Sequence, residues 1–148
     1  MRRSFMLFIL AMPLPTAAFC FDEAGKYYNV DPKLLNAIAK VESSLNPNAY
    51  NENINRNGEV ISRDFGLMQI NSSWFDKLSQ FDVNESSIYE PCFNVYLGAW
   101  VLSSNFATHG YNWNSVGAYN AGFSKRTENA RKIYIQKVKS VYYSQKVK

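Results

Sequence analysis

One predicted helix, residues 31–44, constrains the fold of this chain most, because its buried side combines apolar residues with an acid. The helix begins at Asp31, a typical N-cap residue, and continues with Pro32, whose fixed φ suits the first helical position. Glu42 stands on the apolar side, four and seven residues after members of the stripe. The stripe recurs at spacings of three and four: Leu34, Leu35, Ile38, Val41 and Leu45.

Glu42 has two interpretations from the helix alone. A carboxyl group held against apolar surface keeps its proton to a higher pH, which is what a general acid near neutral pH needs. The structural alternative is a carboxylate that neutralises a buried Arg or Lys, or that lies at the edge of the stripe and reaches solvent. The rest of the chain has to decide between them.

The first 18 residues have the pattern of a secretory signal peptide. Arg2 and Arg3 precede an apolar run that is too short to span a bilayer, and small residues at 16–18 form a cleavage site. Cleavage after Ala18 leaves residues 19–148 as one domain, because this length and a hydrophobic content of 47% suit a single globular core. We therefore expect an exported, periplasmic protein without stable membrane insertion.

Two cysteines remain in the mature chain, Cys20 and Cys92. An even number in an exported protein favours one disulfide, which would close a loop of about seventy residues. Lipid attachment to Cys20 is the alternative, but it requires a small residue before the cysteine, and Phe19 is bulky. Two cysteines and the lone His109 do not suffice for a structural zinc site, so we expect no metal and no cofactor.

Basic residues concentrate at the C-terminus. Residues 125–148 carry a net charge of +7, whereas residues 19–124 carry −5. A basic helix of this kind suits a solvated face, or contact with an anionic polymer, a membrane surface or an acidic partner protein. The acidic body of an exported chain argues against nucleic acid as a partner, and we expect a monomer.

Hydrophobic periodicity predicts a mainly α (α+β) fold. The stretch 46–64 is polar and contains the turn signal Asn57-Gly58, so we expect a small β-hairpin there. On the last helix, three apolar residues look buried: Ile133, Ile135 and Val138. Helices are expected at residues 21–29, 31–44, 66–70, 72–80, 90–107, 113–121 and 125–144.

Three short segments resemble, in this order, the catalytic domain of lytic transglycosylases with the lysozyme-like fold. They are VESSLNPNA around Glu42, DFGLMQINSSW from residue 64 and VGAYNAG from residue 116. The resemblance covers about residues 20–135. It is strongest for the small, specialised transglycosylases that accompany type III secretion, conjugation and pilus machines. It implies a lysozyme-like fold and peptidoglycan glycan strands as the substrate.

The resemblance also implies a role for each segment. Glu42 is expected to deliver a proton to the glycosidic oxygen, and the neighbouring Ser43 to orient the Glu42 carboxyl group. Gly66 stands where the backbone must approach closely. Tyr119 is expected within reach of Glu42 or of the substrate. The residues expected to bind substrate are Ser43, Gln69, Asn71, Tyr119 and Asn120.

Asp64 is the candidate second catalytic acid. Its segment also resembles the part of animal-type lysozymes that carries their second carboxylate, whereas many transglycosylases have no acid there. An Asp64 that faces Glu42 would stabilise the oxocarbenium-like state or form a covalent intermediate. An Asp64 that caps the following turn would leave Glu42 to act alone. Glu59, near the expected turn, is the other candidate, and the 46–64 stretch is several residues longer than lysozyme spacing.

The expected function is lytic cleavage of the β-1,4 bond between N-acetylmuramic acid and N-acetylglucosamine, with a 1,6-anhydro product. This cleavage would open the cell wall locally for a secretion or pilus apparatus, of which the chain would be a component. The first alternative is a hydrolytic lysozyme that uses Glu42 and Asp64. The second is a non-catalytic module that binds glycan or serves as a scaffold in the apparatus.

Overall fold

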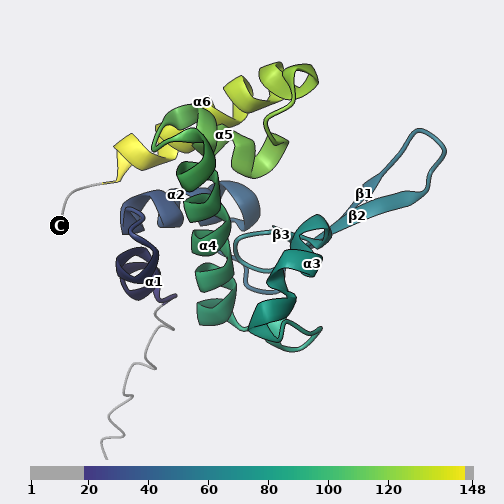
Figure 1. Ribbon diagram of the computed structural model, residues 1–148, viewed down its shortest axis with the longest axis horizontal. Coiled ribbons are helices and arrows are strands. Elements are labelled where there is room, and N and C mark those ends of the chain that lie inside the picture. The colour runs from purple at the N-terminus through teal and green to yellow at the C-terminus, as the bar shows by residue number, and fades with distance from the viewer. Residues whose placement is uncertain (1–18, 146–148) are drawn as a thin grey trace, which may run out of the picture.

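The computed structural model describes residues 19–145, so the expected signal peptide at 1–18 lies outside the described residues. Helices form most of this region, and a small antiparallel sheet extends from one end of the molecule (Figure 1). Within residues 19–145, no helix is both long enough and apolar enough to cross a membrane. In chain order, the elements are α1 (Phe21–Tyr28), α2 (Pro32–Ser43), β1 (Tyr50–Ile54), β2 (Val60–Phe65), β3 (Ile70–Asn71), η1 (Ser72–Trp74), α3 (Phe75–Leu78), η2 (Ser79–Phe81), η3 (Ser87–Tyr89), α4 (Pro91–His109), α5 (Trp113–Ala121), η4 (Lys125–Thr127) and α6 (Glu128–Ser144).

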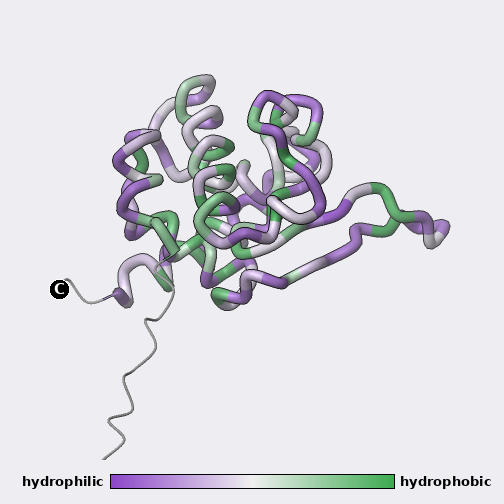
Figure 2. Tube along the Cα trace, turned by 90° about the horizontal axis from the view of Figure 1, so that it is seen from below, coloured by the Kyte–Doolittle hydropathy of each residue, from purple (hydrophilic) through white to green (hydrophobic). Residues whose placement is uncertain are grey.

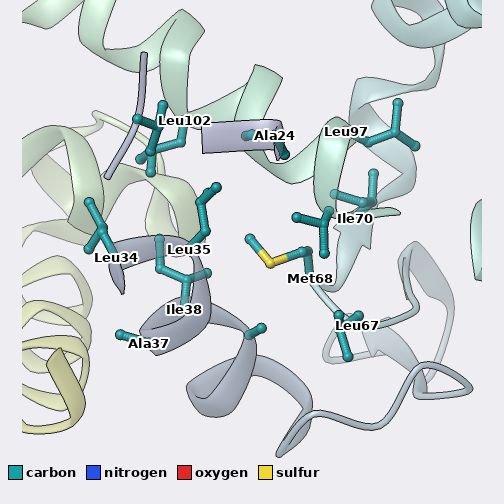
Figure 3. Close-up of a cluster of buried hydrophobic side chains, with 14 of the residues drawn as sticks. Ala24, Leu34, Leu35, Ala37, Ile38, Leu67, Met68, Ile70, Leu97 and Leu102 are labelled. Atoms are coloured by element: carbon teal, nitrogen blue, oxygen red, sulfur yellow. The ribbon is translucent and has the colours of Figure 1, made fainter. Parts of the chain in front are cut away.

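Helix α2 forms as its sequence predicts. The Asp31 carboxylate accepts a hydrogen bond from the Lys33 backbone nitrogen at 2.8 Å, and Pro32 is the first helical residue. The apolar stripe faces the core, where Leu35 and Ile38 are fully buried. The side chains of Leu35 and Ile38 face Met68 and Ile70 in Figure 3. The core therefore lies between α2, α4 and the segment before β3.

The segment 66–70 is a turn followed by β3, and the expected helix there is wrong. Gly66 and Gln69 have φ angles of +73° and +49°, which the interior of a right-handed helix does not allow. Fully buried Asn94 of α4 holds this turn by accepting a hydrogen bond from the Met68 nitrogen at 2.7 Å and by donating to two backbone carbonyls. A Cβ atom on Gly66 would lie 2.5 Å from the Asn94 amide nitrogen, so only glycine fits.

The expected helix at 72–80 is divided into three short pieces, η1, α3 and η2. The long helix at 90–107 and the helix at 113–121 are confirmed as α4 and α5. The helix expected at 125–144 is also confirmed, with its first three residues forming the 3₁₀ turn η4 and the rest forming α6.

The expected hairpin is confirmed and is longer than a minimal one. Strands β1 and β2 pair antiparallel and project from the body, with Gly58 in the turn at a φ of +81° (Figure 1). Asn51 pairs with Asp64 near the base of the hairpin, and Asp64 also pairs with Asn71 of β3. The base of the hairpin is therefore the part that joins the sheet to the helical body.

Helices α5 and α6 approach each other closely. A Cβ atom on Gly117 would lie 2.9 Å from the Ile135 side chain, so this glycine sets the separation of the two helices. Tyr134 and Val138 face the core from α6, and Ile135 is partly buried. Ile133, expected to be buried, is 55% exposed, because it lies one residue off the stripe that contacts α2 and α5.

The disulfide between Cys20 and Cys92 is confirmed, with Cα atoms 5.2 Å apart. It links the residue before α1 to the start of α4, so the Cys20 thiol is used by the bond and the lipid alternative does not apply. The two cysteines are 72 residues apart in sequence, and a cross-link of that length restricts the unfolded chain strongly.

We predict that replacing both cysteines with serine lowers the free energy of unfolding by roughly 4 kcal/mol, the chain-entropy value for a loop of this length. Urea unfolding of the double variant and of the oxidised native protein measures the difference. Equal unfolding midpoints in the two proteins would show that the bond does not stabilise the fold.

Candidate active site

A cleft of about 470 Å³ lies between the small sheet and the helical body. The α2 helix contributes Glu42 to it, and the sheet contributes a row of polar side chains. The turn before β3, η1 and the end of α5 form the rest of the wall. The residues that line it are Glu42, Asn53, Ile61, Ser62, Asp64, Gln69, Asn71, Ser73, Trp74, Ala118, Tyr119, Asn120 and Gly122. All three segments singled out in the sequence therefore meet at one site.

Glu42 projects from the last turn of α2 into this cleft. Burial raises the pKa of Glu42 to about 7, because the charged form loses water. A hydrogen bond from Tyr134 and the charge of Lys137 oppose that rise in pKa, whereas the charge of Asp64 adds to it. The Glu42 carboxyl group therefore exchanges its proton near neutral pH, as an acid that later acts as a base must do.

The sequence patterns did not point to Tyr134 as a site residue. Its hydroxyl donates a hydrogen bond of 2.5 Å to Oε1 of Glu42, across 92 residues of sequence. Tyr134 is buried on α6, which Gly117 allows to lie close against α5. The available signal was its place on the inner stripe of α6, three residues after Arg131 and four before Val138. Nothing in that spacing indicates which distant side chain the hydroxyl contacts.

Asp64 lies in the same cleft and does not cap the turn that follows it. Its carboxylate accepts hydrogen bonds from three side-chain amides: Asn71 at 2.7 Å, Asn53 at 2.8 Å and, more weakly, Asn51 at 3.5 Å. These donors come from the strands on either side of β2. The arrangement keeps Asp64 in a polar setting that contrasts with that of Glu42.

The extra residues between the two carboxylates lie in the projecting hairpin. Asp64 is near the base of β2, next to the body, so the added length extends away from the cleft (Figure 1). Glu59, the other candidate acid, lies at the turn, where its carboxylate accepts a hydrogen bond from Asn55 at 2.7 Å. Glu59 is not among the residues that line the cleft.

Ser43 was expected to orient the Glu42 carboxyl group, but its hydroxyl makes other contacts. Its hydroxyl donates to the backbone carbonyls of Leu67 and Ala39, at 2.7 and 3.1 Å. Helical geometry explains this, since neighbouring residues on a helix point about 100° apart. Ser43 thus ties the end of α2 to the turn before β3, and it does not line the cleft.

The Tyr119 hydroxyl contacts the backbone in place of Glu42. It donates to the Met68 carbonyl at 2.8 Å, while the Tyr119 ring lines the cleft. Burial raises the pKa of Tyr119 well above its ordinary value, so the phenol stays protonated. Tyr119 holds α5 against the turn that carries Gln69.

The other expected substrate-binding residues all line the cleft. The Gln69 amide nitrogen donates to the carbonyls of Gly66 and Ala49, so contact with a sugar would fall to its amide oxygen. The Asn71 amide nitrogen is bound to Asp64 and Ser62. Asn120 is exposed near the end of α5.

In the described part of the chain, no group of three or more His, Cys, Asp and Glu side chains is placed to hold a metal ion. The two carboxyl groups of the cleft are held by a phenol and by amides. The chemistry that this arrangement offers is therefore proton transfer at Glu42 beside a fixed negative charge at Asp64.

A sequence profile of the family described as the transglycosylase SLT domain matches residues 19–141. The chain belongs to this family. As an SLT-domain protein it is a lytic transglycosylase, and the helices with a small three-stranded sheet are its lysozyme-like fold.

Several relatives match this SLT-domain chain over most of its length. The invasion protein IagB of Salmonella typhimurium is 40% identical over 136 residues, which are 90% of this chain and 82% of IagB. The protein IpgF of Shigella flexneri is 36% identical over 93% of this chain and 88% of IpgF. A peptidoglycan-binding-like protein of Escherichia coli O157:H7 is 37% identical over 78% of this chain and 74% of the relative.

A solved structure shares the fold of this SLT-domain chain. It is an inactive mutant of the lytic transglycosylase Slt from Pseudomonas aeruginosa, with a TM-score of 0.61 and 19% sequence identity. The similarity covers 86% of this chain and 24% of the much longer Slt chain. This chain therefore corresponds to about a quarter of the length of Slt.

We predict that Tyr134→Phe moves the alkaline limb of the kcat/KM profile to higher pH. We expect protonated Glu42 to act as the acid, so activity should fall as pH rises through about 7. The Tyr134 hydroxyl stabilises the carboxylate and lowers the pKa of Glu42, so its removal raises that pKa. Turnover of soluble glycan strands between pH 5 and 9 gives the profile.

Tyr119→Phe is the matched control, because its hydroxyl contacts the Met68 carbonyl and not Glu42. The alkaline limb of this variant should keep the wild-type midpoint. An unmoved limb in Tyr134→Phe, or equal shifts in both variants, would contradict the role given to Tyr134.

Proposed function

We propose that this protein cleaves the β-1,4 bond between N-acetylmuramic acid and N-acetylglucosamine in peptidoglycan, with Glu42 as acid and then base. The observation that carries the proposal is a carboxyl group with a pKa of about 7 that faces a cleft lined by polar side chains. A module that only binds glycan has no need for such a carboxyl group, because holding it there costs stability at neutral pH.

In the first step, Glu42 donates its proton to the glycosidic oxygen. The bond from that oxygen to the anomeric carbon breaks, and the N-acetylglucosamine side leaves as an alcohol. Tyr134 occupies Oε1 of Glu42, so the proton is delivered from the other carboxyl oxygen. The departing sugar leaves positive charge on the anomeric carbon of N-acetylmuramic acid.

In the second step, the Glu42 carboxylate acts as a base. It removes the proton of the 6-hydroxyl of N-acetylmuramic acid, and that oxygen attacks the anomeric carbon. The product is a 1,6-anhydro ring, Glu42 regains its proton, and no water is consumed. Tyr134 supports this step, because its hydrogen bond stabilises the charged form of Glu42 between proton transfers.

Asp64 supplies negative charge where the oxocarbenium-like state develops. Its carboxylate is fixed by the amides of Asn53 and Asn71, so it needs little rearrangement as charge forms. The same placement favours a second candidate function, a hydrolytic lysozyme in which Glu42 and Asp64 act as a pair. The two functions differ in their products, which are anhydro ends and reducing ends respectively.

We place this activity in the periplasm, at an envelope-spanning secretion or pilus apparatus. The support is the expected signal peptide, the disulfide, and the similarity to the invasion protein IagB. Local cleavage of the wall would make room for such an apparatus. We propose that four residues that line the cleft contact the glycan: Gln69, Asn71, Tyr119 and Asn120.

We predict that purified protein releases muropeptides with 1,6-anhydro ends from intact sacculi, and that Glu42→Gln lowers the rate by at least roughly 10²-fold, the usual contribution of a general acid. The substitution keeps the shape of the side chain and removes the acid. Mass spectrometry of the products measures the outcome, and thermal melting of the variant checks that it folds. Reducing ends from the wild-type protein would assign it to the hydrolases.

We predict that Asp64→Asn lowers kcat roughly 10-fold or more while the products keep their anhydro ends, since the variant loses one fixed charge near the developing cation. Glu59→Gln is the matched control, because this acid lies at the hairpin turn, away from the cleft. Equal rates for Asp64→Asn and Glu59→Gln would show that Glu42 works without a partner.

A further inference from the structure

The hairpin directs the side chain of one isoleucine, Ile61, toward the catalytic cleft. Along β2, Ser62 and Asp64 line the cleft, whereas Arg63 and Phe65 line a separate groove on the opposite side of the sheet. Strict alternation of side chains would place Ile61 on the same side as Arg63. Ile61 lines the cleft instead, beside Ser62.

A β-bulge explains this orientation. Asn53 of β1 pairs with Ser62. The next residue of β1, Ile54, pairs with Val60, so Ile61 has no opposite residue in the ladder. The extra residue of a bulge breaks the alternation of side chains, and bulges beside active sites re-aim single side chains in this way.

Ile61 is 66% exposed, although it is among the most apolar residues. Figure 2 shows a hydrophobic stretch on the projecting hairpin, between polar segments. The other side chains that the sheet contributes to the cleft are polar: Asn53, Ser62, Asp64 and Asn71. When a ligand covers an apolar side chain in this wall with apolar surface, the burial favours binding.

We propose that Ile61 is a substrate-binding residue that contacts the methyl groups which the glycan strand carries on its acetamido and lactyl substituents. This inference rests on the proposed function, because the strand has to be the substrate. Ile61 is three residues from Asp64, roughly 10 Å along an extended strand. Ile61 therefore contacts a sugar beside the one that reacts, and it acts on binding while leaving the bond-breaking step alone.

The test compares Ile61→Ala with Ile54→Ala in steady-state cleavage of peptide-free glycan strands. Ile54 is the matched control, because it lies on the same hairpin and is 63% exposed, but does not line the cleft. We expect Ile61→Ala to raise KM about fivefold with kcat within about twofold, in line with the apolar area that it removes. Ile54→Ala should keep both constants, and both variants should keep the wild-type melting temperature.

A second arm identifies the methyl groups, with the inactive Glu42→Gln protein as background. Weaker binding of an N-acetylglucosamine oligomer after Ile61→Ala supports contact with acetamido methyls. Weakening confined to strands with N-acetylmuramic acid supports contact with lactyl methyls. Unchanged binding of both ligands, or equal KM changes for Ile61→Ala and Ile54→Ala, would overturn the inference. Wild-type protein that cleaves no glycan at all would instead overturn the proposed function.

Discussion

The hydrogen bond from Tyr134 to Glu42 joins helix α6 to the end of helix α2, and the candidate active site depends on this contact. Glu42 stands at the end of α2, whose apolar stripe anchors it in the core. Tyr134 comes from α6, and it reaches Glu42 because Gly117 lets α5 and α6 approach closely. The carboxyl group is thereby shielded from water and held by one donor. Burial raises the pKa of Glu42 to about 7, and the hydrogen bond from Tyr134 limits that rise.

The sheet provides the opposite environment on the other side of the cleft. The Asp64 carboxylate accepts amide hydrogen bonds from neighbouring strands, whereas burial disfavours the charged form of Glu42. The buried Asn94 fixes the turn between β2 and β3, and so it fixes where the sheet meets the helices. Two carboxyl groups with different environments in one cleft are an arrangement that many glycosidases use.

The sequence predicted those features that depend on local patterns. The start of α2, the hairpin, the disulfide and the place of Glu42 on the buried side all follow from spacing and residue type, and the structure confirms them. Features set by distant contacts were missed. The pattern at 66–70 predicted a helix, but hydrogen bonds with the distant Asn94 hold this segment as a turn. The pattern also suggested Tyr119 as the partner of Glu42. The partner is Tyr134, and only the fold brings Tyr134 to that carboxyl group.

The account depends most on the protonation of Glu42, and this can be observed directly. The protein is labelled with ¹³C at the glutamate side-chain carboxyl carbons, and its NMR spectrum is followed from pH 3 to 9, with Glu42→Gln to assign the signal. The account predicts that the Glu42 signal titrates with a midpoint near 7. A midpoint near 4.5, the ordinary value for a glutamate, would contradict it.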